Sequence, residues 1–211
     1  MKLAGGQKDQ GIVIGNVFDK YGSGNPLVRR IMRGFEENLA ALVTAAGPVD
    51  IHEVGCGEGY WILRWNEQGI AARGCDFSQQ VIDLARQNAI ERGLDTSLFE
   101  TRSIYELDPV RDRADLVVCC EVLEHLKDPE AALEALRRIV GRHLILSVPW
   151  EPTWRVLNMA RGKYLARMGN TPGHLQHWSR RGFVTLVSRY FDVVEVRRPL
   201  PWTMLLCQPR D

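Results

Sequence analysis

Short apolar runs of strand type alternate with amphipathic helical stretches along most of the chain. Residues 26–46 begin with a proline at a helix-start position and repeat apolar residues at helical spacing. Strands separated by helices of about ten to fifteen residues form βαβ units, so this alternation predicts a mostly parallel sheet with helices on both faces. The expected strands are 49–54, 71–75, 97–103, 115–120 and 143–148, and further helices are expected at 60–68, 78–92 and 129–140.

The end of the chain follows a different pattern. Ser179 is placed to cap a helix, and the runs 192–198 and 204–207 are joined by a short turn that contains two prolines. This arrangement predicts an antiparallel hairpin at the edge of the sheet. We therefore expect a doubly wound α/β fold of about seven strands in a single domain, because 211 residues suffice for one well-buried core and are few for two.

Charge and cysteine content exclude several classes of protein. The formal net charge of +1 gives no general attraction to phosphate backbones, so no nucleic-acid partner is expected. The longest apolar runs are too short to span a bilayer, and the first residues lack a secretory pattern, which favours a cytoplasmic location. The five cysteines form no Cys-x-x-Cys pair and have no histidine at metal-ligand spacing, so we expect buried thiols and no metal.

A glycine-rich loop at residues 55–59 is the most informative local feature. It follows an expected strand and opens an expected helix, as a nucleotide-binding loop does. Asp76 lies 21 residues beyond Gly55 at the end of the next strand, where a carboxylate can accept hydrogen bonds from a ribose diol. The spacing therefore predicts a nucleoside-containing cofactor.

The same loop distinguishes between cofactors. A dinucleotide fingerprint places its third glycine five residues after the first, where this chain has Tyr60, and Gly59 comes one residue early. Glu53 stands just before the loop, where its charge disfavours a pyrophosphate and favours an ammonium group. An amino-acid nucleoside is therefore preferred to NAD.

Three segments resemble the class I S-adenosylmethionine-dependent methyltransferases, in particular the small-molecule branch that includes the ubiquinone and menaquinone enzymes. They are residues 53–59, 74–78 and 115–126, and the likeness covers about residues 50–149. The resemblance implies a Rossmann-like fold, S-adenosyl-L-methionine as cofactor, and a single methyltransferase domain over 1–211. Residues 1–46 would form an N-terminal helical cap, and 150–178 an insertion on the substrate side.

The resemblance also implies roles for single residues. Asp76 binds the ribose hydroxyls, Phe77 covers one adenine face, and Glu121 lies near the methionine end of the cofactor. Where many relatives carry an acidic residue for the adenine amino group, this chain has only the Ser103 hydroxyl or the backbone of Ile104. The full set of expected cofactor contacts is Glu53, Gly55, Cys56, Gly57, Asp76, Phe77, Ser103, Ile104, Glu121 and Tyr21. A neighbouring acid, Glu124, fits a solvated helical turn better than a functional role.

Residues 150–178 are longer than a plain connection and leave a central strand at its carboxyl end. We expect them, with a helix at 156–168, to overhang the transferable methyl group, opposite a second wall at 18–25. A hydroxyl acceptor benefits from a base, so the candidate catalytic residues are His174, His177 and His125. Trp150, Trp154, Tyr164 and Trp178 fit either an acceptor pocket or core packing.

These features favour methyl transfer to a small-molecule acceptor, with O-methylation slightly preferred. A run of the Asn/Asp-Pro-Pro-Tyr/Phe type, which by family resemblance marks methylation of nucleic-acid bases, is absent after residue 120. Two alternatives remain at this point: a module of the same fold that binds S-adenosylmethionine without catalysis, and an NAD-dependent oxidoreductase.

Overall fold

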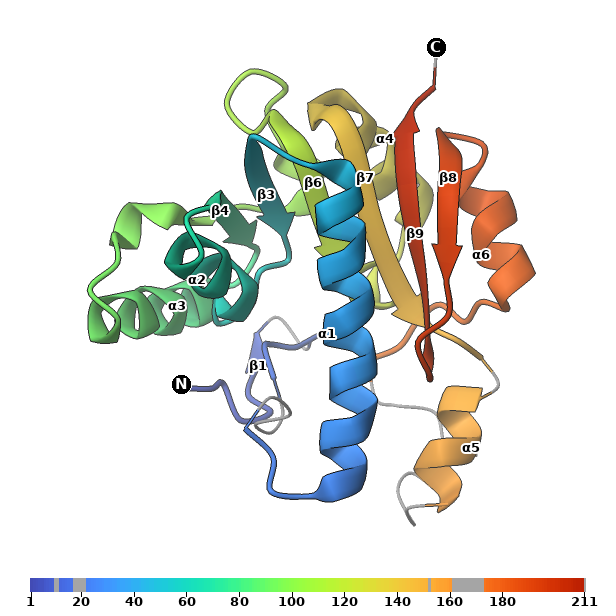
Figure 1. Cartoon of the computed structure of the whole chain (residues 1–211), viewed down its shortest axis with the longest axis horizontal. Coiled ribbons are helices and arrows are strands. Elements are labelled where there is room, and N and C mark those ends of the chain that lie inside the picture. Colours follow the sequence, from blue (N-terminus) through green and yellow to red (C-terminus); the bar gives the residue numbers. More distant parts are fainter. Residues whose placement is uncertain (10–11, 17–21, 152, 161–172, 211) are drawn as a thin grey trace.

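The computed structural model describes residues 1–9, 12–16, 22–151, 153–160 and 173–210 of the chain. Seven strands form one sheet in the order β5-β4-β3-β6-β7-β9-β8 (Figure 1). Neighbours from β5 to β7 pair in parallel, whereas β9 pairs antiparallel with both β7 and β8. The predicted doubly wound sheet and its antiparallel edge hairpin are thus confirmed. No helix within the described ranges is long and apolar enough to cross a membrane.

The observed elements follow the predicted ones closely. The strands of the sheet are β3 Asp50–Val54, β4 Ala71–Asp76, β5 Phe99–Thr101, β6 Ala114–Cys120, β7 Val140–Pro149, β8 Phe191–Arg197 and β9 Trp202–Pro209. The helices are α1 Pro26–Ala46, α2 Tyr60–Glu67, α3 Gln79–Glu91, α4 Pro129–Ile139, α5 Thr153–Ala160 and α6 Arg180–Val187. The described residues also contain 3₁₀ turns at η1 Thr96–Leu98, η2 Ile104–Glu106 and η3 Leu123–His125.

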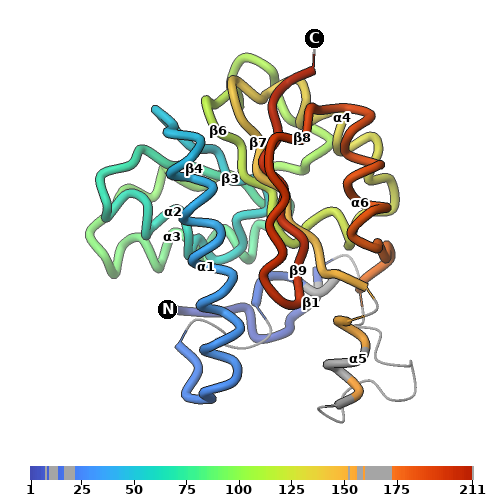
Figure 2. The backbone as a smooth tube through the Cα atoms, turned by 45° about the vertical axis from the view of Figure 1, so that its right-hand side comes forward, coloured from blue at the N-terminus to red at the C-terminus, as the bar shows by residue number. Residues whose placement is uncertain are grey.

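Helices cover both faces of the sheet because successive strand residues point in opposite directions. In β6, Leu116 and Val118 pack in the core under α1, α2 and α3, whereas Val117 and Cys119 pack in the core under α4 and α6. Figure 2 shows these two helical layers on opposite sides of the sheet. A strand buried on both faces has no polar side, which explains the continuous apolar runs in the sequence.

Side-chain caps mark the starts of several helices. The Asn25 and Ser179 side chains accept hydrogen bonds from backbone N–H groups in the first turns of α1 and α6. Ser78 precedes α3, but its side chain makes no cap bond. The strand expected over 97–103 is shorter, because Asp95 accepts from the Ser97 N–H and holds residues 96–98 in a 3₁₀ turn.

The N-terminal region differs from the expected helical cap. Within 1–46 the helix occupies only Pro26–Ala46, and a small antiparallel hairpin, β1 Lys8–Asp9 with β2 Ile12–Val13, precedes it. This hairpin lies beyond the carboxyl ends of β3 and β4 (Figure 1). Strands of two residues carry no readable period in a sequence, which is why the hairpin was missed.

Candidate active site

The glycine loop lies directly after β3, at the edge of the sheet where the parallel strands end. Gly55 has φ +79°, and a Cβ atom there would stand 2.3 Å from the Val122 side chain, so the loop packs tightly on that side. Gly57 has φ +53°, and a Cβ atom there would meet no heavy atom within 4 Å. The loop therefore presents bare backbone to open space at Gly57, which suits the approach of a ligand.

Asp76 ends β4 beside this loop, as predicted. Its Oδ2 accepts from the Gly57 N–H at 3.1 Å and its Oδ1 from the Ser78 N–H at 3.1 Å. Burial raises the pKa of Asp76, and the two backbone hydrogen bonds oppose this shift. The carboxylate is thus fixed in orientation next to the backbone that a cofactor would approach.

Glu53 and Cys56 flank the start of the loop. Glu53 is 5% exposed and sits mid-sheet, opposite Gly74 of β4 and Val118 of β6. Burial raises the pKa of the Cys56 thiol, so this thiol stays protonated. All five cysteines are free.

The residues expected to contact adenine each have partners within the protein. Phe77 packs against a small cluster that includes Ala4, Ile14 and Val81. The Ser103 hydroxyl accepts from the Tyr105 N–H and caps η2, and Ile104 is buried at 6% exposure. The hydroxyl of Ser103 thus has one partner within the protein, and its contact with adenine stays a prediction. Tyr21 lies outside the described residues.

Glu121 occupies a strained position after β6. Its φ is +60°, a left-handed conformation that costs a non-glycine residue about 1–2 kcal/mol. Its Oε1 accepts from Ser147 Oγ at 2.9 Å, and its Oε2 accepts from Trp202 Nε1 at 2.7 Å. These bonds tie β6, β7 and β9 together at the ligand edge, and strain of this kind often marks functional sites.

Glu124 lies in η3 and corrects the sequence interpretation. It is 1% exposed, so it is not part of a solvated turn. Its carbonyl accepts from the N–H groups of Leu175 and Gln176 at 2.8 and 3.0 Å, and His125 Nδ1 lies 3.0 Å from the Gly173 oxygen. The far end of the insertion is thereby held onto the turn that follows β6.

Three potential ligand groups meet at this junction. One ligand atom each from Glu124, His125 and His174 lies within 4.8 Å of the others. Burial lowers the pKa of His125, and burial together with the other histidines lowers the pKa of His174 to about 3. Both rings are therefore neutral near pH 7 and retain a lone pair, as metal-binding imidazoles require. This junction could hold a cation, although the cysteine and histidine spacing predicted none.

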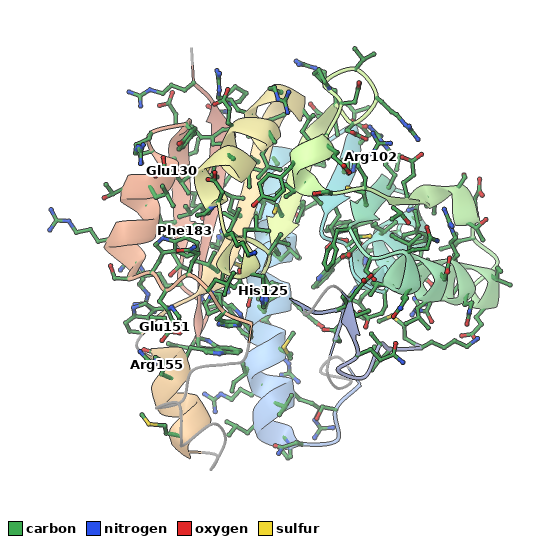
Figure 3. All side chains as sticks on the ribbon, turned by 180° about the vertical axis from the view of Figure 1, so that it is seen from behind. Arg102, His125, Glu130, Glu151, Arg155 and Phe183 are labelled. Carbon is green, nitrogen blue, oxygen red and sulfur yellow. The ribbon has the colours of Figure 1, made fainter. Side chains whose placement is uncertain are left out.

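The described part of the insertion forms a wall beside these groups. Trp150 and Trp178 form a parallel bridge, so the two ends of the insertion lie side by side. The Trp154 ring stacks 6.0 Å from His174 and lies 6.0 Å from Trp202. The exposed His177 is not part of the three-residue cluster. Figure 3 shows His125, Glu151 and Arg155 toward this end of the molecule.

Trp150 and Trp178 make other contacts. Arg180 lies 3.4 Å over the Trp150 ring, and Trp178 packs on Phe183. Both therefore serve packing, and Trp154 is left as the described tryptophan of the insertion that faces the histidines. Tyr164, the predicted helix beyond residue 160, and residues 18–21 of the expected second wall lie outside the described residues.

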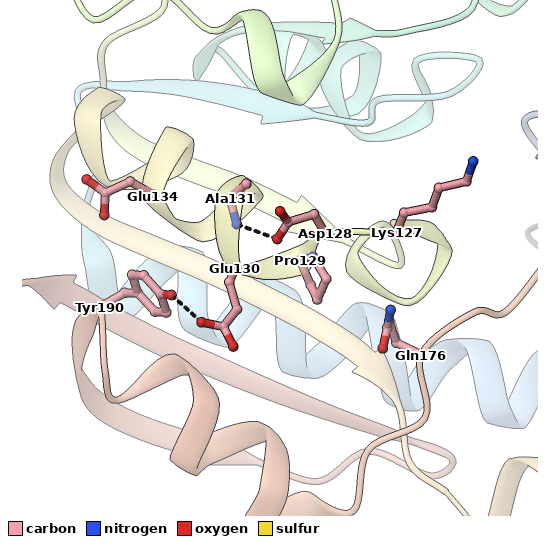
Figure 4. A pocket seen from close by; sticks show the side chains of 8 residues that line it. All are labelled: Lys127, Asp128, Pro129, Glu130, Ala131, Glu134, Gln176 and Tyr190. Carbon is pink, nitrogen blue, oxygen red and sulfur yellow. Dashed lines mark hydrogen bonds between the residues drawn. The ribbon is translucent and has the colours of Figure 1, made fainter.

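A broad depression of about 760 Å³ lies elsewhere, over the start of α4 (Figure 4). Two of its carboxylates already have partners: Asp128 accepts from the Ala131 N–H, and Glu130 accepts from the Tyr190 hydroxyl. None of its lining residues is an expected cofactor contact. The glycine-loop edge, and not this depression, is the candidate site.

Comparisons with known proteins identify methyltransferases as relatives. A family described as a methyltransferase domain matches residues 52–144. The ubiquinone biosynthesis O-methyltransferase of Aeromonas salmonicida (strain A449) is 27% identical over 121 residues, which cover 56% of this chain and 51% of that protein. The enzyme of the same name from Alkalilimnicola ehrlichii (strain ATCC BAA-1101 / DSM 17681 / MLHE-1) is 29% identical over 152 residues, or 65% and 61%. The chain thus spans about half to three-fifths of these relatives.

Solved structures share the fold at low sequence identity. The magnesium protoporphyrin IX methyltransferase from Synechocystis PCC 6803 with bound SAH aligns with TM-score 0.67 at 20% identity, covering 90% of this chain and 91% of that one. The PH0226 protein from Pyrococcus horikoshii OT3 aligns with TM-score 0.72 at 16% identity, covering 92% and 97%.

Proposed function

Because the chain carries a class I S-adenosylmethionine-dependent methyltransferase domain, we propose that it transfers a methyl group from S-adenosylmethionine to a hydroxyl of a small-molecule acceptor. One observation carries this proposal. The Gly57 loop with Asp76, and the junction of His125 and His174, occupy neighbouring strand ends at one edge of the sheet. Ligands of α/β proteins bind at this edge.

On this proposal, the chain's own residues chiefly bind and align. Gly57 and Asp76 hold the nucleoside, and the Glu53 carboxylate lies near the amino-acid end. Methyl transfer from a sulfonium is an in-line displacement, so correct alignment supplies much of the acceleration. Trp154, stacked on His174, offers a flat apolar wall for an acceptor ring. The matched relatives are named as ubiquinone biosynthesis O-methyltransferases. This likeness supports oxygen over nitrogen as the atom that this chain methylates.

The electrostatics of His174 argue against a role as general base. A group with a pKa of about 3 binds a proton too weakly to abstract one from a hydroxyl near pH 7. We propose instead that Glu124, His125 and His174 hold a divalent cation, since two neutral imidazoles and a carboxylate suit transition metals or Zn²⁺. His125 Nδ1 can donate its hydrogen to the Gly173 carbonyl, so that Nε2 is the nitrogen available to the ion. Metal-binding histidines usually donate their other ring N–H to a carbonyl or carboxylate in this way. A bound cation would lower the pKa of an acceptor hydroxyl.

A methyl-transfer assay tests the function. The protein is incubated with S-adenosylmethionine and a panel of phenols, catechols and aromatic amines, and the demethylated cofactor is quantified. We expect turnover with a ring hydroxyl. Binding of the cofactor without turnover on any member would favour the non-catalytic binding module. Turnover on amines alone would contradict the preference for oxygen. A cytoplasmic location and the absence of a nucleic-acid substrate stay predictions.

The metal site is tested without turnover. Mn²⁺ binding to the metal-stripped protein is followed by electron paramagnetic resonance for wild type, His174→Ala and His143→Ala. His143, near the amino end of β7, is a matched control because it is remote from the junction. We expect binding to be lost only in His174→Ala. Equal binding by all three proteins would remove the cation from the proposal and leave His177 as the candidate base.

A further inference from the structure

Residues 2–9 and 12–16 lie across the glycine loop and the start of α3, and their contacts are not explained by the fold alone. The hairpin β1–β2 stands beyond the strand ends that carry the proposed cofactor contacts (Figures 1 and 2). We call the described residues 2–9 and 12–16 the strap. The strap contacts the loop, Ser78 and Phe77 through three separate sets of interactions.

The first set centres on Glu58, a loop residue that is only 1% exposed. Its Oε1 accepts from the N–H groups of Ala4 and Asn16 at 3.0 and 2.7 Å, and its Oε2 accepts from Asn16 Nδ2 at 2.7 Å. A Cβ atom at Gly15 would stand 2.3 Å from Oε1, so only glycine permits this approach. A buried carboxylate needs donors, and those of Glu58 come from the strap.

The second set joins the strap to the ribose-binding position. Ser78 Oγ donates to Asp9 Oδ2 at 2.7 Å, and the Ser78 N–H donates to Asp76. Asp76 in turn accepts from the Gly57 N–H, next to Glu58 in the chain. The hydrogen bonds therefore close a ring that runs from the strap through the loop and Asp76 back to the strap.

The third set is apolar. Ala4 and Ile14 of the strap and Val81 of α3 form a buried cluster on which Phe77 packs. Phe77 is the expected cover of the adenine ring, so the strap supports the side chain that would hold the base. Asn88 adds a polar link, because its Nδ2 donates to the carbonyls of both Lys2 and Glu58 at 3.1 Å.

We propose that the strap is part of the cofactor site, latched to the glycine loop by Glu58, and that cofactor exchange requires this latch to open. Glu58 is then a positioning residue that acts through Gly57 and Asp76. The proposal rests on the proposed function, since it takes S-adenosylmethionine as the ligand of the loop. It predicts that weakening the latch from either side speeds cofactor release.

The test measures dissociation of S-adenosylhomocysteine by stopped flow from wild type, Glu58→Gln, Asn16→Ala and the control Glu67→Gln. Glu67 pairs with Arg92 on the exposed end of α2 and does not touch the strap. The Glu58→Gln change keeps the shape of the side chain but removes its charge and sets an amide against the Asn16 donor. Loss of a charge-assisted hydrogen bond predicts dissociation about tenfold or more faster in the first two variants, with Glu67→Gln unchanged.

Amide hydrogen exchange supplies a second measurement. If the strap had only a structural role, cofactor binding would not change the exchange rates of its amides. In wild type, S-adenosylhomocysteine should slow exchange of amides 4–16, and this protection should shrink in both latch variants. Asn16→Ala leaves the loop sequence intact, so it remains informative if Glu58→Gln fails to fold. If Asn16→Ala binds S-adenosylhomocysteine and releases it at the wild-type rate, the proposed role of the strap is wrong, whereas the proposed function is unaffected. No binding by wild type would overturn the strap and the proposed function together.

Discussion

At the residue scale, the positions that sequence reasoning identified best are those fixed by the backbone. Gly57 adopts a left-handed backbone conformation with open space beside its Cα atom, and Asp76 stands at the end of a strand. The spacing of the two residues in the sequence was enough to predict these positions. Glu124 was misjudged because a helix-start position favours acids in any case. Its burial depends on residues 173–176, some fifty positions later, which no local pattern shows. The adjacent pair Glu124-His125, followed by His174, was the available signal.

The first prediction concerns Gly57→Val. A branched side chain at φ +53° strains the backbone by about 1–2 kcal/mol and fills the space where the cofactor approaches. Gly93→Val is the matched control, with φ +68° and equally open surroundings in the turn after α3. Circular dichroism should show two folded proteins with similar losses of stability. Calorimetry should show cofactor binding lost only in Gly57→Val, and tight binding there would mean that the loop faces elsewhere.

A second prediction follows from His174. Its pKa is about 3 in the folded protein and near 6.5 when unfolded. Between these values the unfolded chain binds a proton that the native protein does not, so stability falls as pH drops below about 6.5, by up to about 1.4 kcal/mol per pH unit. Urea unfolding of metal-stripped protein at pH 7.5 and 5 should show a smaller decrease in His174→Gln than in wild type. An identical decrease would contradict the burial of His174.

At the scale of elements, capped helices and the continuous strands were predictable because their signals are local. Pro26, Pro129 and the glycine after Ala46 mark helix ends directly. The turns η1, η2 and η3 and the hairpin β1–β2 were not predicted, since each spans three residues or fewer per element. The hydrogen bonds of Glu121 were not predictable either, because its partners Ser147 and Trp202 come from two strands that are distant in the sequence.

The third prediction concerns the insertion. Trp150 and Trp178 already lie side by side, so removing residues 154–172 should leave the ends joined and the sheet intact. We expect the affinity for S-adenosylhomocysteine to stay within about twofold, because the loop and Asp76 are untouched. Turnover of the acceptor should be lost together with the Trp154 wall. Full turnover in the deletion variant would show that 150–178 does not bind the acceptor.

At the scale of the whole molecule, topology followed from a few general rules. Right-handed crossovers and two helical layers place the ends of β3, β4, β6 and β7 at one edge, so motifs far apart in sequence must meet there. The acceptor was not predictable, because the walls that select it come from the insertion and depend on tertiary packing. The role of 1–211 as a single methyltransferase domain stays a prediction.

The central claim, that the glycine loop and Asp76 bind S-adenosylmethionine, is tested most directly by calorimetry. S-adenosylhomocysteine and NAD are titrated into wild type, Asp76→Ala and the control Asp83→Ala, which lies exposed on α3. Loss of hydrogen bonds to a charged group predicts binding about 10- to 100-fold weaker in Asp76→Ala. Wild type and Asp83→Ala should bind S-adenosylhomocysteine equally, and none should bind NAD. Unchanged affinity in Asp76→Ala, or binding of NAD alone, would contradict the account.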